Sequence, residues 1–162
     1  MARNIDVTVA AVIARGDRFL VVEELVNGTR VFNQPAGHLE HGESLRNAVV
    51  RETLEETGYR FEPTDVVGIY VWQSEDGTTF LRVVFCGTHL PPAEPPRLDE
   101  GIVDVHWLSR SQILAREREL RSPLVLRCLD DYVAGVRYPL EVLSHIVSEG
   151  RASSALSGGV RR

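Results

Sequence analysis

The sequence of 162 residues predicts a single α/β domain, with a mixed β-sheet covered by helices on both faces. Runs of β-forming residues fill much of the chain, and a stretch without Gly or Pro interrupts them from Glu43 to Thr57. Hydrophobic residues make up 43% and charged residues 25%, which is typical of a globular protein with a buried core. We expect the domain to span residues 1–150, followed by a flexible tail over 151–162 that is rich in Ser, Gly and Arg.

Turn residues separate the expected elements. Gly16-Asp17 and Asn27-Gly28 end the first two β-type runs, and Gly58 is a typical residue after the end of a helix. Residues 91–101 contain four prolines and are expected to form an exposed loop. The expected strands are 7–13, 19–25, 30–32, 66–72, 79–86 and 102–108, and the expected helices are 43–57, 109–114, 123–134 and 139–147, the third of them capped by Ser122.

The composition excludes several classes of function. All 18 basic residues are Arg, so neither a Schiff-base lysine nor a Walker-type phosphate loop is available. The net charge of -5 argues against nucleic-acid binding through a basic patch. Cys86 and Cys128 stand alone, which excludes a disulfide framework and a CxxC site.

The location and assembly of the protein can also be predicted. The sequence contains no run of ~18 apolar residues, so no membrane-spanning helix is expected. Polar residues precede the first apolar run, unlike in a signal peptide. We therefore expect a cytoplasmic protein without a membrane partner, and the lack of an obvious exposed apolar stripe favours a monomer.

The expected helix 43–57 has an unusual acidic stripe. On a helical wheel, Glu52 and Glu56 continue the line of Leu45, and Glu55 lies at the edge of this stripe. Like charges three and four residues apart are each unfavourable by ~0.2–0.5 kcal/mol. The C-terminal end of a helix disfavours negative charge further. A solvated face is the simple interpretation, but a bound Mg²⁺ or Mn²⁺ would make these carboxylates favourable.

The loop before this helix offers further candidate groups. Gly37 lets the backbone approach a ligand closely, and its carbonyl could join a metal site. Arg51 could hold a neighbouring glutamate in place, although an ordinary surface ion pair is the alternative. Gln34 lies where it could contact a base or phosphate. Arg82, on a strand, could bind phosphate, and Trp72 and Phe80 could either stack on a base or pack in the core.

These residues together resemble the Nudix family. Gly37, Glu43 and the run Arg51-Glu52-Thr53-Leu54-Glu55-Glu56-Thr57-Gly58 match the Nudix box, except that Thr53 occupies a position that is usually aliphatic. Segments 19–24, 33–40, 120–125 and 137–141 resemble the NudJ-type phosphatase branch.

The resemblance implies an α/β/α sandwich that hydrolyses phosphoanhydride bonds with Mg²⁺. In the NudJ branch it implies phosphate release from nucleoside tri- and diphosphates, and action on hydroxymethylpyrimidine diphosphate. It also implies that Glu52, Glu55, Glu56 and the Gly37 carbonyl bind the metal, with Glu43 and Arg51 in support. Glu52, Glu56 and the loop residue Glu100 remain alternatives for the general base.

Two other functions stay open. The first is a Nudix pyrophosphohydrolase acting on a nucleotide sugar, ADP-ribose or an oxidised dNTP. The second is a non-catalytic nucleotide sensor, which the complete set of box glutamates disfavours.

Overall fold

Two β-sheets form the centre of the molecule in the computed structural model, which describes residues 5–148. The five-stranded sheet has the order β5-β1-β7-β6-β9. Its strands β1 and β7 are parallel, and the β1–β5, β7–β6 and β6–β9 pairs are antiparallel. The strands are β1 (Ile5–Val12), β5 (Ala36–His38), β6 (Arg60–Gln73), β7 (Thr79–Leu90) and β9 (Tyr138–Pro139).

The second sheet is smaller and antiparallel. In it β3 pairs with β2, β4 and β8, and the register places Glu23 opposite Asp104. Its strands are β2 (Ala14–Arg15), β3 (Arg18–Val26), β4 (Thr29–Asn33) and β8 (Ile102–Ser109). The expected mixed sheet therefore exists, and β2, β3, β4 and β8 form a separate, antiparallel sheet beside it.

Helix α1 (Leu45–Thr57) begins and ends at local signals in the sequence. The Ser44 side chain accepts a hydrogen bond from the Asn47 N–H, so the helix starts two residues after the expected Glu43. Gly58 has a φ of 75° and donates its N–H to the Leu54 carbonyl, which ends the helix where the sequence predicts. Ala48 and Val49 are fully buried and pack α1 against the five-stranded sheet.

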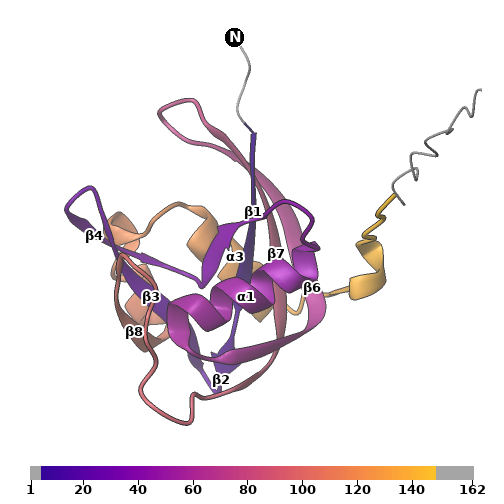
Figure 1. Cartoon of the computed structure of the whole chain (residues 1–162). Coiled ribbons are helices and arrows are strands. Elements are labelled where there is room, and N and C mark those ends of the chain that lie inside the picture. The colour runs from indigo at the N-terminus through magenta and orange to yellow at the C-terminus, as the bar shows by residue number, and fades with distance from the viewer. Residues whose placement is uncertain (1–4, 149–162) are drawn as a thin grey trace, which may run out of the picture.

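Helix α3 (Leu124–Val133) covers the other side of the molecule, which confirms helices on both faces (Figure 1). Leu124, Val125 and Leu129 are buried in a second core with residues of β1, β3 and β7. Two short elements precede this helix, α2 (Arg110–Leu114) and the 3-10 helix η1 (Glu117–Glu119). No side chain caps α3, so the predicted capping role of Ser122 is wrong.

The predicted helix 139–147 is also wrong. Tyr138 and Pro139 form strand β9 against Val66 and Asp65 of β6, and only the short 3-10 helix η2 (Leu140–Val142) follows. The pairing with β6 holds the start of this segment in extended geometry, and residues 143–148 have no regular secondary structure. The predicted tail 151–162 lies outside the described residues. Within residues 5–148, no helix has both the length and the apolar character needed to cross a membrane.

Candidate active site

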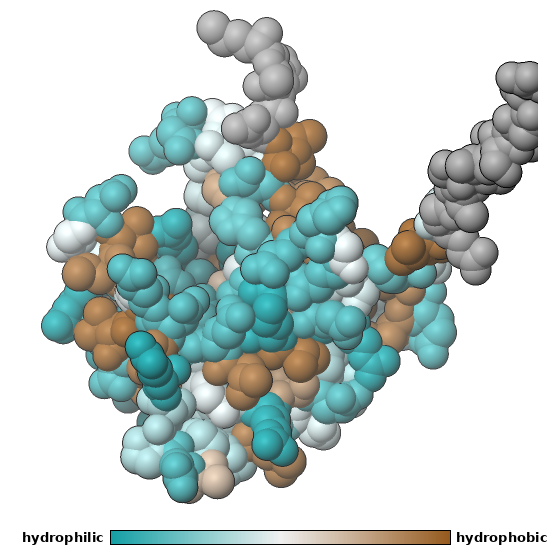
Figure 2. Space-filling model, viewed as in Figure 1, coloured by the Kyte–Doolittle hydropathy of each residue, from teal (hydrophilic) through white to brown (hydrophobic). Residues whose placement is uncertain are grey.

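A cavity of about 340 Å³ lies where α1, the loop around β5 and the strands β3, β4, β6 and β7 meet. Residues from distant parts of the sequence line it, because the two sheets and α1 converge there. Hydrophilic side chains cover the exposed face of α1 beside this region (Figure 2). Its lining residues include Glu24, Asn33, Gly37, Glu52, Glu56, Trp72, Phe80, Arg82, Arg121 and Ser122.

Gly37 lies at a close approach between β5 and α1. A Cβ atom at this position would overlap the carboxylate of Glu52. Glu52 therefore lies directly against the backbone of the β5 loop, and a side chain at position 37 would have to displace its carboxylate. Burial is the largest effect on Glu52 and raises the pKa of its carboxyl group.

Glu56 is the most buried of the three glutamates on α1, with 7% of its surface exposed. Its Oε2 accepts a hydrogen bond of 3.0 Å from the Ala36 N–H, which ties the end of α1 to β5. Burial raises the pKa of Glu56 to about 9, and the charges of Glu24, Glu52 and Asp99 act in the same direction. A carboxyl group in this position favours the uptake of a proton or a cation.

Arg51 connects the loop before α1 with the glutamates on it. Its Nε and Nη2 donate to the two carboxylate oxygens of Glu43 at 2.7 and 3.0 Å, and Nη2 also donates to the His38 carbonyl at 3.1 Å. Its Nη1 lies between Glu52 at 2.8 Å and Glu55 at 3.1 Å. These contacts raise the pKa of Arg51 and lower that of Glu43, so both groups stay charged. Arg51 therefore links Glu43 in the preceding loop to Glu52 and Glu55 on the helix.

The donor set suits a hard divalent cation. Glu52 and Glu56 line the cavity together with Gly37, and Glu55 lies one turn from Arg51 with an exposed side chain. Carboxylate oxygens are the ligands that Mg²⁺ and Mn²⁺ prefer. The overlap that a Cβ at Gly37 would cause shows that this loop is shaped to the Glu52 carboxylate. The residues present thus fit such an ion.

Arg82 and Gln34 have different surroundings. Arg82 is 7% exposed, lines the cavity, and donates from Nε to Thr8 Oγ1 at 3.4 Å, while its Nη1 has no partner. Gln34 is also buried, but it borders a separate apolar cavity of about 10 Å³. The structure thus brings Arg82 to the candidate site and places Gln34 beside the core.

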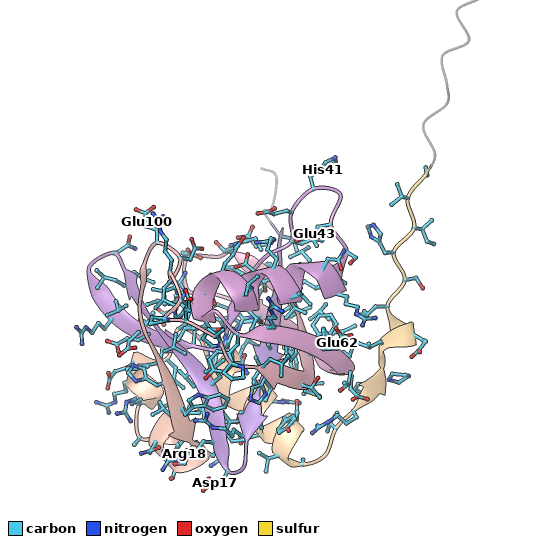
Figure 3. The ribbon with its side chains drawn as sticks, turned by 60° about the horizontal axis from the view of Figure 1, so that its bottom comes forward. Asp17, Arg18, His41, Glu43, Glu62 and Glu100 are labelled. Atoms are coloured by element: carbon cyan, nitrogen blue, oxygen red, sulfur yellow. The ribbon has the colours of Figure 1, made fainter. Side chains whose placement is uncertain are left out.

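The loop acid nearest the box glutamates is Asp99 rather than Glu100. The Asp99 N–H donates to the Glu55 carbonyl at 3.0 Å, which fixes the loop against the end of α1. Its charge raises the pKa of both Glu52 and Glu56. Glu100 is exposed at the tip of the loop (Figure 3). Both acids lie in the proline-rich loop, and the sequence contained no signal to show which of them lies against α1.

The structure adds Glu24 to the cavity wall, and it also places there Trp72 and Phe80, two of the candidates from the sequence. Glu24 lines the cavity half-buried and accepts a hydrogen bond of 3.4 Å from Asn33 Nδ2. The rings of Trp72 and Phe80, also in the lining, stack with centroids 5.3 Å apart. Ser122 completes this part of the wall. The Glu24 and Ser122 side chains had no distinguishing motif, because their meeting depends on the tertiary fold.

A second acidic group lies outside this cavity. Glu23, Asp104 and His106 on β3 and β8 each place one potential ligand atom within 4.8 Å of the others, and within residues 5–148 they are the one such group. His106 Nε2 lies 2.7 Å from a Glu23 oxygen, and Arg30 pairs with the other at 3.0 Å. Glu23 is thus already paired, and the group does not contribute to the cavity.

Comparison with known proteins agrees with this arrangement. The NUDIX domain profile matches residues 4–128. Phosphatase NudJ of Escherichia coli (strain K12) is 42% identical over 139 residues, covering 85% of this chain and 89% of that protein. The phosphatase NudJ of Shigella sonnei (strain Ss046) matches with the same identity and coverage.

Solved structures show the same fold. A NUDIX hydrolase from Nitrosomonas europaea superimposes with a TM-score of 0.85 at 48% identity, covering 88% of this chain and 98% of the other. The MutT protein from Methanosarcina mazei Go1, at 23% identity and a TM-score of 0.67, shares the fold over 83% of this chain and 98% of its own. The chain therefore belongs to the Nudix hydrolases and is a NudJ-like member of that family.

Proposed function

We propose that this enzyme hydrolyses phosphoanhydride bonds of nucleoside tri- and diphosphates, and of hydroxymethylpyrimidine diphosphate, with Mg²⁺ and with release of inorganic phosphate. The observation that supports this best is the convergence of Glu52, Glu56 and Gly37 on one cavity that also contains the buried Arg82. The similarity to phosphatases named NudJ supports the product.

The box residues have distinct parts in this proposal. Glu52, Glu55, Glu56 and the Gly37 carbonyl would hold the divalent cation, with Mn²⁺ as a possible substitute for Mg²⁺. When bound, the cation supplies positive charge beside phosphate oxygens on which negative charge develops. Arg51 keeps the glutamates oriented through its contacts with Glu52 and Glu55.

A carboxylate also has to accept a proton from the attacking water. Glu52 and Glu56 are in the wall of the cavity, and burial raises the pKa of both. Glu100 points outward at the tip of its loop. These positions favour a box glutamate as the general base over Glu100.

The decisive measurement is a substrate panel with product identification. Wild-type enzyme is incubated with Mg²⁺ and each nucleoside tri- and diphosphate, hydroxymethylpyrimidine diphosphate, ADP-ribose and a nucleotide sugar. Phosphate and pyrophosphate are then quantified separately. Phosphate from GTP supports the proposal, whereas pyrophosphate would establish a pyrophosphohydrolase. Tight nucleotide binding without turnover of any substrate would indicate a sensor.

The metal role has its own test. Glu55→Gln should lower kcat by at least about 100-fold, comparable to removing one preorganised electrostatic group. Glu119→Gln, an exposed glutamate on η1, is the matched control and should behave as wild type. Phosphate release by Glu55→Gln at the wild-type rate, with unchanged Mg²⁺ dependence, would contradict the proposal.

A further inference from the structure

Three buried polar side chains in the cavity have atoms without any hydrogen-bond partner. They are Asn33 Oδ1, Arg82 Nη1 and Ser122 Oγ, on residues that are 5%, 7% and 6% exposed. All three residues line the same cavity. A buried polar atom without a partner is costly to stability, so three in one wall indicate that a ligand satisfies them.

These atoms differ in their hydrogen-bonding chemistry. Asn33 Nδ2 donates to Glu24, which sets the orientation of the amide and leaves Oδ1 as an acceptor. Arg82 Nη1 can only donate, and the Ser122 hydroxyl can do either. A phosphate oxygen could accept from Arg82 and Ser122, but an ionised phosphate offers no proton to Asn33. The missing ligand therefore presents a donor and an acceptor together.

Ser122 is in this wall because of a tertiary contact. The Arg121 N–H donates to the Phe32 carbonyl at 2.8 Å, which sets the 120–122 segment beside the end of β4, next to Asn33. Its hydroxyl is not used to cap α3, although the sequence favours that role. A serine that lines the cavity with its hydroxyl unpartnered, instead of capping the helix, is consistent with a binding function.

Two opposite charges in this region, Glu24 and Arg82, do not pair with each other and so remain available to a ligand. Glu24 and Arg82 are close enough for each to affect the pKa of the other, yet within residues 5–148 neither forms a salt bridge of 4.0 Å or less. The stacked rings of Trp72 and Phe80 form an aromatic part of the same wall. Aromatic side chains with convergent polar groups suit a flat polar ring.

We propose that Asn33, Ser122 and Arg82 form a specificity site for the edge of a planar nitrogen heterocycle. Such a ring presents an N–H donor beside a carbonyl or ring-nitrogen acceptor, as nucleobases and aminopyrimidines do. The site rests on the proposed function, since it holds the ring of the substrate whose phosphates lie at the box glutamates. It assigns Arg82 to the ring instead of to a phosphate.

The first experiment measures selectivity between substrates with and without a ring. The ratio of kcat/KM for a nucleoside triphosphate to kcat/KM for inorganic tripolyphosphate is determined with Mg²⁺. Asn33→Leu and Ser122→Ala should each lower this ratio about 10-fold, by loss of hydrogen bonds to the ring. Thr53→Val is the matched control, because its buried hydroxyl is also unpartnered but does not line the cavity. An unchanged ratio in both site variants would overturn the proposal.

The second experiment needs no turnover and no metal. Cytidine or adenosine is titrated into the isotope-labelled protein, and the two tryptophan indole resonances are followed by NMR. Trp72 should shift and Trp107 should not, because the Trp107 Nε1 donates to Tyr59 on another part of the molecule. A Trp72 shift with ribose 5-phosphate as large as the shift with the nucleoside would overturn the proposal. So would the absence of a Trp72 shift at roughly 10 mM nucleoside, a concentration above a millimolar Kd. A protein that binds the nucleoside in this way but hydrolyses nothing would refute only the proposed function.

Discussion

At the scale of single residues, functional groups are held where stability alone would not place them. Glu56 is buried with a pKa raised to about 9, and Asn33, Arg82 and Ser122 have unpartnered atoms in the cavity. Such groups cost stability unless a ligand or cation satisfies them. Thr53 differs, because its unpartnered hydroxyl is fully buried away from the cavity. The unpartnered Thr53 hydroxyl, like the buried Gln34 Oε1, has no functional counterpart in the proposed site.

Replacing Thr53 by valine should therefore stabilise the protein. Valine has nearly the same shape, and the change removes a buried hydroxyl without a partner, which is worth about 1 kcal/mol. Thermal unfolding should show a melting temperature higher by roughly 2–5 °C. The kcat of the variant should equal that of wild type. A lower melting temperature would show that the hydroxyl has a partner in solution.

Gly37→Ala tests the close approach between β5 and α1. The added methyl group would displace the Glu52 carboxylate, a flexible end that can move without unfolding the protein. We expect kcat to fall roughly 10–100-fold, as when a group that orients a ligand is lost, with little change in melting temperature. The measurement is a pair of assays, phosphate release and thermal unfolding. A variant that keeps full activity would contradict the role given to this loop.

At the scale of elements, the site depends on how α1 is joined to the loop before it. Arg51 on α1 pairs with Glu43 just before the helix and with the His38 carbonyl of β5. Ala36, also on β5, donates to Glu56. Two independent links thus hold β5 against the acidic face of α1.

Arg51→Lys should break this junction while keeping the charge. A lysine cannot reproduce the two-point contact with Glu43 or reach Glu52, Glu55 and His38 together. We expect kcat to fall roughly 10–100-fold and the midpoint of Mg²⁺ activation to rise. Arg46→Lys is the control, since Arg46 on the same helix pairs only with the exposed Glu62 in the described part of the chain. Equal effects of the two variants would refute the positioning role.

Local signals explain which elements could be predicted from the sequence. The structure confirms the predicted turns at Gly16-Asp17 and Asn27-Gly28 and the end of α1 at Gly58. Each depends on a residue with a positive φ. The predicted helix 139–147 is wrong because its first residue, Pro139, pairs with Asp65 of β6, a contact between distant segments. Glu52, Glu55 and Glu56 belong to one helix and could be grouped by its period. Glu24, Ser122 and Asp99 come from separate segments, and only the fold brings them near that helix.

At the scale of the whole molecule, two cores on either side of the five-stranded sheet supply stability that offsets the unfavourable buried polar groups of the cavity. Buried residues of α1 pack on one side, and those of α3 on the other. The cavity lies where this sheet, the smaller sheet and α1 meet, so its walls are rigid elements and not mobile loops alone. The three glutamates of α1 can remain close together because the rest of the fold outweighs their repulsion.

The stability of the metal-free protein should therefore depend on pH through Glu56. The pKa of this group rises from 4.5 to about 9 on folding, so the folded state binds the proton more tightly. The contribution of Glu56 is fully present below pH 4.5 and is lost as the pH rises towards 9, with a slope of up to about 1.4 kcal/mol per pH unit. Glu56→Gln should remove this part of the slope and make the metal-free protein more stable than wild type at pH 8.

Denaturant unfolding with a chelator at several pH values between 5 and 9 measures this difference. Adding Mg²⁺ should stabilise wild type at pH 8, because the cation replaces the proton that Glu56 would otherwise retain. The gain should be much smaller in Glu56→Gln. Parallel pH profiles for the two proteins would show that the Glu56 carboxyl is ionised without a cation, and would remove the electrostatic reason for a metal beside it.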